Sequence, residues 1–177
     1  SPASLELGTT VAIHDNAGDL VWWGAGTNLS QVTYRGEPAL CVYRSDGQGG
    51  SEYVLLDSSY TEVASFAMAG GYATDMHDIA FSPDGSRVLL LSYHQVDYDL
   101  SEYGGPADAV VMDVVVQEQD VTTGEVTFEW RGLDHVPVDE TQEPLTTDLV
   151  DYMHANSLAY DADGDLLMSG RNTSTVY

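Results

Sequence analysis

The stretch from residue 151 to residue 171 reads DYMHANSLAYDADGDLLMSGR, and its pattern predicts a β-hairpin. Two strand-like runs flank a DADG turn, and successive side chains of a strand point to opposite faces of a sheet. The alternation places Asn156, Leu158 and Tyr160 on one face, with His154 in line with them. We therefore expect His154 and Asn156 to share one face of a hairpin.

The register of this hairpin decides which residue lies opposite His154. If the chain folds back about Ala162 and Asp163, Arg171 lies opposite His154, because both residues are equally far from the turn. A register centred one residue later pairs His154 with Thr173, and Arg171 is then a diagonal neighbour that still reaches the imidazole. Cationic and hydrogen-bond-donating groups converge in both registers, which predicts a small anion site at this end of the hairpin.

The composition is that of a strongly acidic, globular protein. The 177 residues are 43% hydrophobic and 10% aromatic, which suits one domain, or part of one, with a sizeable core. There are 29 acidic residues against five Arg and no Lys, so the formal net charge is −24. Such a surface disfavours nucleic acid and anionic membranes as partners. It suits a secreted or salt-rich environment, and a cation-binding role is the alternative.

The negative charge does not exclude a local anion site, because salt screens exposed charges beyond about 10 Å at 0.1 M. Cys41 is the single cysteine, so no internal disulfide can form, and its apolar neighbours predict a buried thiol. No run of about 18 apolar residues predicts a membrane-spanning helix. No charged-then-apolar leader precedes Ser1, and for a secreted protein we expect a signal peptide to have been removed.

Strand signals recur along the whole chain, whereas helical periodicity is scarce. Short β-branched and aromatic runs, separated by Gly, Asp, Asn and Pro turns, predict strands at 9–14, 19–23, 29–34, 39–44, 51–57, 61–67, 77–81, 87–93, 112–119 and 125–131. When Gly85 is aligned with Gly164, His77 and Asn156 both lie eight residues before their glycine. The segments thus form a loose repeat.

A repeat of four strands over about 40 to 50 residues is typical of a β-propeller blade. We therefore predict an all-β fold, a propeller of four-stranded antiparallel blades, with long loops near 97–108 and 133–151 on the rim that carries the binding site. The predicted partial domain, 1–177, consists of an outer hairpin (9–23), two blades (28–68 and 76–131) and an inner hairpin (153–171). Roughly three blades are present, and propellers close with about four to eight. We expect the remaining blades in a longer protein or in a second chain.

The motif His154-x-Asn156-Ser157, which leads through an Asp-Gly turn to Ser169-x-Arg171, resembles the arylsulfotransferase family, specifically its secreted bacterial and fungal branch. The resemblance covers nearly the whole chain, which is similar to the N-terminal half of that branch. Further segments that carry it, in the same order, are GSEYVLLDSSY (50–60), DMHD (75–78), VQE (116–118), TGE (123–125), FEW (128–130) and LDHVP (133–137).

The resemblance implies a six-bladed propeller that holds a sulfuryl group in its central channel. A histidine of such a protein is transiently sulfated by an aryl sulfate and passes the group to a phenol, without a nucleotide donor or any cofactor. The partners implied are therefore a small aryl sulfate and a phenol. The implied location is secreted or extracellular, with the periplasm as the alternative.

Four residues of this chain match the family's site. His77 and His154 are the implied catalytic residues, and Asn156 and Arg171 are the implied substrate-binding residues. The nucleophilic histidine of the family belongs to a later blade, so we expect it beyond Tyr177. A guanidinium fork suits a bidentate contact with an oxyanion, an amide donates without titrating, and an imidazole can protonate a leaving phenolate near neutral pH.

Several other residues have structural interpretations. His14, His94 and His135 are expected in loops or at strand ends, and the Trp22–Trp23 pair is expected to pack inside a blade. The sequence DADGD at 161–165 resembles a calcium loop, but its glycine precedes the third Asp and no Glu closes it. We expect an ordinary hairpin turn there and no metal site.

Two hypotheses for the function follow. The first is an arylsulfotransferase-like protein that moves a sulfuryl group between phenols through a sulfohistidine outside these residues. The second is a non-catalytic β-propeller that serves as a binding or scaffold module. In both, residues 1–177 alone are expected to bind better than they turn over.

Overall fold

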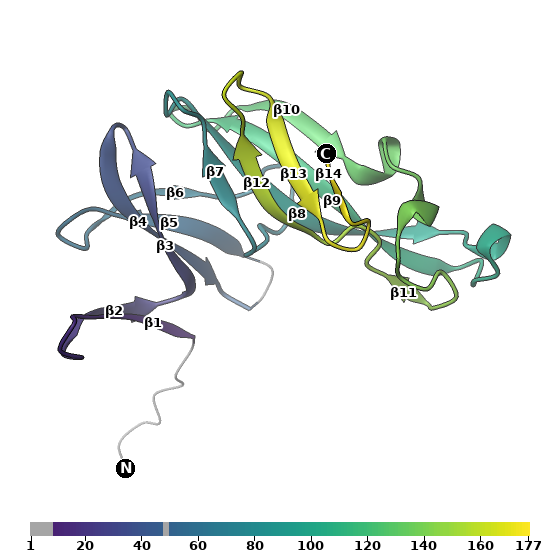
Figure 1. Cartoon of the computed structure of the whole chain (residues 1–177), viewed down its shortest axis with the longest axis horizontal. Helices are drawn as coiled ribbons and strands as arrows, with labels where there is room; N and C mark the ends of the chain where they lie inside the picture. Colours follow the sequence, from purple (N-terminus) through teal and green to yellow (C-terminus); the bar gives the residue numbers. More distant parts are fainter. Residues whose placement is uncertain (1–8, 48–49) are drawn as a thin grey trace, which may run out of the picture. The chain divides into compact units, whose positions relative to one another are not determined.

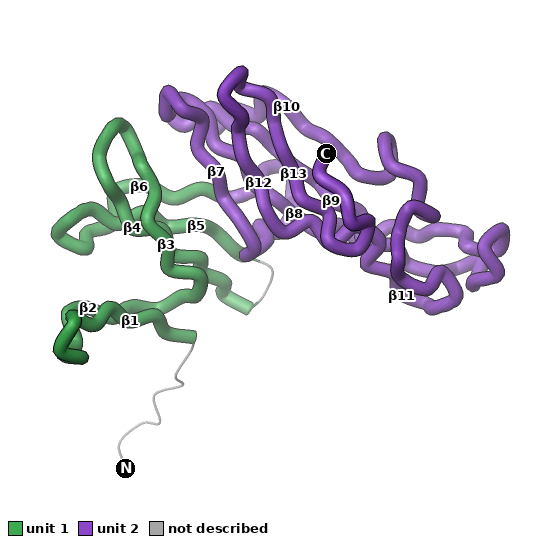
Figure 2. Tube along the Cα trace, in the orientation of Figure 1, with its two compact units in different colours: residues 1–66 green, residues 67–177 purple. Residues whose placement is uncertain are grey.

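The computed structural model describes residues 9–47 and 50–177, and these residues form an all-β structure in which the helices are short 3-10 turns (Figure 1). The chain divides into two compact units, residues 1–66 and 67–177 (Figure 2). Consecutive strands pair antiparallel within each sheet, which confirms the predicted all-β class. No helix among the described residues is long and apolar enough to span a membrane.

The first unit contains a two-stranded hairpin and a four-stranded sheet. The hairpin pairs β1 (Thr10–His14) with β2 (Leu20–Ala25). The sheet is a meander of β3 (Thr27–Tyr34), β4 (Glu37–Ser45), β5 (Ser51–Leu56) and β6 (Glu62–Phe66). Each strand lies beside its sequence neighbour, which is the arrangement of a propeller blade.

In the first unit, a cluster of buried apolar side chains lies on β4 and β5. Val42 and Val54 are buried there, and Cys41 is fully buried, as its apolar neighbours predict. Trp22 stacks on Tyr60 with ring centroids 5.4 Å apart, whereas 63% of Trp23 is exposed. The expectation that both tryptophans pack inside a blade is therefore wrong for Trp23, because alternation along β2 turns the two side chains to opposite faces.

The second unit contains a four-stranded meander and a three-stranded sheet. The meander comprises β7 (Ile79–Phe81), β8 (Arg87–Tyr98), β9 (Ala109–Asp120) and β10 (Val126–Arg131), and the short β11 (Leu149–Val150) pairs parallel with β9. The other sheet comprises β12 (Ala155–Tyr160), β13 (Leu166–Gly170) and β14 (Thr175–Val176). The 3-10 helices are η1 (Ser101–Tyr103), η2 (Gly132–Asp134) and η3 (Val138–Glu140).

Strands β8 and β9 are longer than their sequence indicates. The predicted strand ends at Tyr93 and a loop is expected from about residue 97, but β8 continues to Tyr98, which pairs with Ala109. Polar residues such as Asp97 interrupt the apolar pattern here, so periodicity fails to reveal the extension. Pairing such as that of Val96 with Val111 continues the ladder across it. His94 consequently lies inside β8 and not at a strand end.

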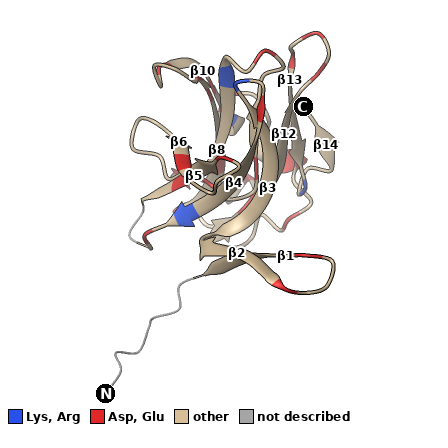
Figure 3. Ribbon diagram, turned by 90° about the vertical axis from the view of Figure 1, so that its left-hand side faces the viewer, with Lys and Arg blue, Asp and Glu red and all other residues tan. Residues whose placement is uncertain are grey.

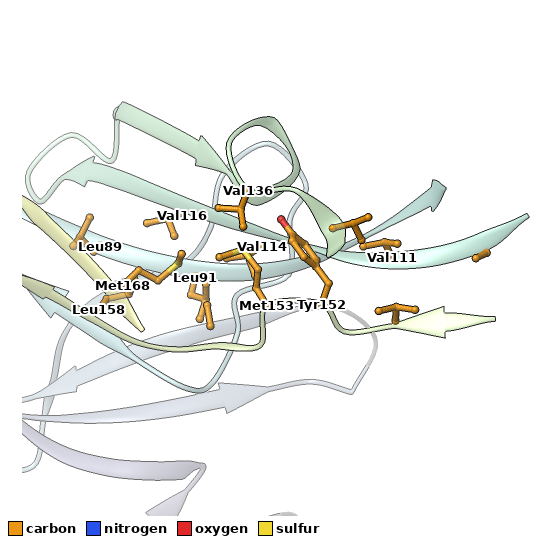
Figure 4. Packing of buried hydrophobic residues seen from close by; sticks show 14 of the residues in the cluster. Leu89, Leu91, Val111, Val114, Val116, Val136, Tyr152, Met153, Leu158 and Met168 are labelled. Atoms are coloured by element: carbon orange, nitrogen blue, oxygen red, sulfur yellow. The ribbon is translucent and has the colours of Figure 1, made fainter. Parts of the chain in front are cut away.

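The core of the second unit lies between the meander and the three-stranded sheet (Figure 4). Leu89 and Leu91 of β8 are fully buried and share one face of the sheet, two residues apart. Met153, Leu158 and other residues from the region of β12 and β13 belong to the same cluster. Burial of this apolar surface is the main favourable contribution to the stability of the unit.

The turn between β12 and β13 is an ordinary hairpin turn, as predicted. The Asp161 carboxylate accepts the backbone N–H groups of Asp163, at 2.8 Å, and Asp165, at 2.9 Å. Gly164 adopts φ +87°, a left-handed conformation that glycine reaches without steric cost. The carboxylate of Asp161 therefore stabilises the turn itself.

The predicted position of Arg171 opposite His154 is confirmed by a backbone hydrogen bond of 3.1 Å from the Arg171 N–H to the His154 carbonyl. The pairing arises differently from the prediction, because a β-bulge between Ala155 and Ser157 shifts the register by one residue. The bulge also interrupts the predicted alternation. Ala155 is fully buried. Because the bulge lies between Ala155 and Ser157, simple alternation no longer places Asn156 on the same face as Leu158.

Several acidic residues of the described chain lie in its hairpin turns. In five hairpin turns an aspartate carboxylate accepts the N–H of the residue two positions later, and acidic residues (red in Figure 3) lie on several of these turns. These aspartates are Asp15, Asp57, Asp84, Asp120 and Asp161. Hydrogen bonds from Ser82 and Ser86 lower the pKa of Asp84 to about 2. Aspartate is favoured in such turns because its side chain completes the turn locally.

We predict that Leu91→Ala lowers the free energy of unfolding by about 2–5 kcal/mol, because it leaves a cavity in the core of the second unit. Urea unfolding followed by circular dichroism measures the loss. Leu149→Ala is the matched control, since 54% of Leu149 is exposed, and it should cost less than about 0.5 kcal/mol. Equal losses in the two variants would contradict the assignment of the core.

Candidate anion-binding site

The two histidines predicted for the site meet in the second unit. His77 lies in the segment before β7 and His154 in the segment before β12, and these two strands lie side by side (Figure 1). The imidazole centroids are 5.2 Å apart, with the ring planes at 77°, in an edge-to-face arrangement. The structure therefore brings together two residues that are 77 positions apart in the sequence.

Each imidazole is held by an aspartate that shortly precedes it. The His77 Nδ1 lies 2.6 Å from the Asp75 Oδ1, and the His154 Nδ1 forms a short contact with the Asp151 Oδ2. The same carboxylates accept the backbone N–H groups of the two histidines, at 2.8 Å for His77 and 3.1 Å for His154. Each aspartate thus fixes both the turn and the orientation of the imidazole.

The segments that carry these pairs are anchored to the sheets. The Asp75 N–H donates to the Leu91 carbonyl of β8 at 2.7 Å. The buried side chain of Asn172 donates to the Asp151 carbonyl at 2.6 Å, and its backbone N–H donates to the Met153 carbonyl at 2.9 Å. These bonds hold the aspartate–histidine pairs against the core.

His154 has an uncommon backbone conformation. Its φ is +48°, in the left-handed region that residues other than glycine seldom adopt. The conformation is held by the bond of the His154 N–H to Asp151 and by the bond of the His154 carbonyl to the Arg171 N–H. Arg35 and Tyr60 adopt similar φ values in the first unit, so this conformation orients His154 without by itself marking a functional site.

Tyr93 of β8 packs against both histidines. Its ring centroid lies 6.1 Å from that of His77 and 6.0 Å from that of His154. Its hydroxyl donates to the Ala155 carbonyl at 2.5 Å. Burial raises the pKa of Tyr93, the carboxylates of Asp75 and Asp151 raise it further, and Arg171 acts in the opposite direction. The phenol therefore keeps its proton and donates a hydrogen bond near neutral pH.

Arg171 provides a permanent positive charge at the site. It follows β13, and its Nε donates to the Asn172 Oδ1 at 3.1 Å. The other two arginines of the second unit form ion pairs, Arg87 with Glu118 and Arg131 with Asp113. Among the described residues, no carboxylate pairs with Arg171. Its guanidinium is therefore available to an anion.

Asn156, the fourth predicted residue, lies in the bulge at the start of β12 and is half-buried. Its side-chain amide forms no hydrogen bond within the part of the chain that the structure describes. The structure thus gathers His77, His154 and Arg171 around Tyr93 and places Asn156 in β12, two residues after His154.

The remaining histidines have structural partners. His14 bonds the Gly18 carbonyl through its Nδ1 at 3.0 Å, and His135 stacks on Trp130 with centroids 5.3 Å apart. His94 contacts the edge of another ring, that of Tyr72. No group of three or more His, Cys, Asp or Glu side chains suited to a metal ion occurs among residues 9–47 and 50–177.

Sequence reasoning missed three residues of the site, Asp75, Asp151 and Tyr93. The spacings Asp-x-His and Asp-x-x-His are visible in the sequence and would indicate the two carboxylate–imidazole pairs. Tyr93 carries no such signal, because it comes from β8 and joins the histidines only through the pairing of strands.

Comparison with known proteins supports a family for this chain. A solved structure described as "Structure of Dos1 propeller" is similar at 11% identity and a TM-score of 0.44, covering 90% of this chain and 36% of that one. No curated protein matches. The family model described as Arylsulfotransferase (ASST) matches residues 37–177, which include all the residues of the site. The chain therefore belongs to the arylsulfotransferase family.

Proposed function

We propose that this site binds the sulfuryl group of an aryl sulfate and that the protein transfers the group to a phenol through a sulfohistidine. One observation carries the proposal. His77 and His154 meet edge to face beside Arg171, which has no carboxylate partner among the described residues of a strongly acidic chain. Family membership supports the class of reaction.

The chemistry of the transfer suits these groups. In the first step the S–O bond to the phenol breaks, an N–S bond forms on the nucleophilic histidine, and negative charge develops on the leaving phenolate. Arg171 can contact two sulfuryl oxygens with its planar fork. His77 or His154, when protonated, can give a proton to the phenolate. Such preorganised donors stabilise the charge of the transition state.

The second step returns the enzyme to its starting state. The acceptor phenol attacks sulfur, the N–S bond breaks, and the phenol proton passes to an imidazole that acts as a base. By the family resemblance the sulfated histidine lies outside residues 1–177, and His77 and His154 assist it. We also propose a secreted location, which the acidic composition suits.

We predict that Arg171→Ala, made in a protein that also carries the proposed nucleophilic histidine, lowers the rate of sulfuryl transfer from an aryl sulfate to a second phenol by about 10²–10³-fold, because one oxyanion contact is lost. Release of the donor phenol, followed by absorbance, measures the rate. Arg35→Ala is the matched control, since Arg35 lies over the Tyr34 ring in the first unit and should leave the rate unchanged. An unchanged transfer rate in the Arg171→Ala variant would contradict the assignment of the site.

We predict that incubation with an aryl sulfate in the absence of an acceptor leaves a sulfuryl group on one histidine. Mass spectrometry of peptides prepared at mildly alkaline pH should find the adduct outside residues 1–177, and a phenol should remove it. A double replacement of His77 and His154 by Ala should reduce the adduct strongly, because the two imidazoles that assist the transfer are lost. Absence of the adduct in the unaltered protein would instead support a non-catalytic binding module.

A further inference from the structure

Both imidazoles of the site are held through the same nitrogen. The Nδ1 atoms of His77 and His154 face the carboxylates of Asp75 and Asp151. A carboxylate only accepts hydrogen bonds, and a neutral imidazole carries a single N–H. The hydrogen atoms therefore lie on Nδ1, and each Nε2 presents a lone pair.

The two Nε2 atoms are free to meet a ligand. No described residue forms a hydrogen bond with the Nε2 of either ring, and the side chains of His77 and His154 keep 35% and 20% of their surface exposed. An oxyanion also presents only lone pairs, so it repels an unprotonated Nε2. The imidazoles become donors to an anion only when each takes up a second proton.

The net charge of the groups around the histidines also favours protonation of the imidazoles when an anion binds. Asp75 and Asp151 carry two negative charges and Arg171 one positive charge, so the cluster with neutral imidazoles has a net charge of about −1. Asp78, the residue after His77, adds a further negative charge, and its oxygens are bonded to two backbone N–H groups. With Asp78 included, the net charge is about −2, and two added protons raise it to about 0.

We propose that the site takes up protons at His77 and His154 when it binds a tetrahedral oxyanion, so that anion affinity falls as the pH rises above neutrality. Asp75 and Asp151 are positioning residues that stabilise the two imidazolium ions. Tyr93 cannot supply the protons, because its hydroxyl stays protonated and donates to the Ala155 carbonyl. This inference rests on the proposed function in one respect: the residues that bind the oxyanion are the same residues that are proposed to hold the sulfuryl group.

The probe is inorganic sulfate, which does not titrate near neutral pH. Calorimetric titration of the purified protein at pH 8, in buffers of different ionisation enthalpy, gives the number of protons taken up on binding. We expect between one and two protons, and a Kd for sulfate that rises at least tenfold from pH 6 to pH 8. A proton uptake of zero, a pH-independent Kd or an absence of sulfate binding at both pH values would overturn the proposal.

The variants Asp75→Asn and Asp151→Asn keep a hydrogen-bond acceptor for the turn and remove the charge that stabilises the imidazolium. Each should lower the proton uptake and flatten the pH dependence of Kd, and Asp75→Glu or Asp151→Glu should restore part of both. Asp99→Asn is the matched control, since Asp99 accepts the Ser101 N–H at 2.9 Å in the same kind of turn without a histidine. An equal change in the control would overturn the role of the two carboxylates.

A second measurement does not depend on the folding of any variant. Nitrogen NMR of the unaltered protein at pH 8 should show the Nδ1–H tautomer for two histidines without sulfate and imidazolium signals for them with sulfate. Unchanged signals would overturn the proposal. Proton-coupled sulfate binding without transfer to a phenol would instead contradict only the proposed function.

Discussion

The site depends on the close approach of β7 and β12, and the Asp78 carboxylate joins these two strands. One oxygen accepts the N–H of Ile79, the first residue of β7, at 2.9 Å, and the other accepts the N–H of Leu158 in β12 at 2.8 Å. Burial raises the pKa of Asp78, whereas these two backbone hydrogen bonds lower it. Because a half-buried carboxylate is costly unless its oxygens are bonded, the two bonds favour the arrangement in which β7 and β12 lie side by side. His77, the preceding residue, thereby lies beside His154.

An anion site in a chain of net charge −24 requires that nearby carboxylates be engaged elsewhere. Many aspartates bond the backbone of their own turns, and Glu118 and Asp113 neutralise the other two arginines of the unit. Asp75 and Asp151 combine the turn bond with a bond to an imidazole. The same turn chemistry that makes the chain acidic thus also orients the histidines.

The predicted pairing of His154 with Arg171 holds in the structure, although the register around the turn differs from the one expected. The sequence was sufficient for the positions of most strands, because turn signals are local, but not for the full length of β8. It was not sufficient for the bulge near Ala155, which corrects the register, since no residue type marks it. Nor did it reveal the contact of Tyr93 with both histidines, which requires β8 to lie beside β7 and β7 beside β12. Long-range strand order is the information that periodicity lacks.

Protonated imidazoles can also give a proton to the leaving group of a sulfate ester. An imidazolium has an ordinary pKa of about 6.5 and a phenol one of about 10, so proton transfer from the one to a phenolate is favourable by more than three units. An alkoxide is a far stronger base than a phenolate and must be protonated earlier, while the S–O bond is still breaking. Under the proposed function, an imidazolium at His77 or His154 is therefore acid enough to protonate an aryl leaving group once the S–O bond has broken. The protons taken up with the anion are then the same ones that the leaving phenolate receives.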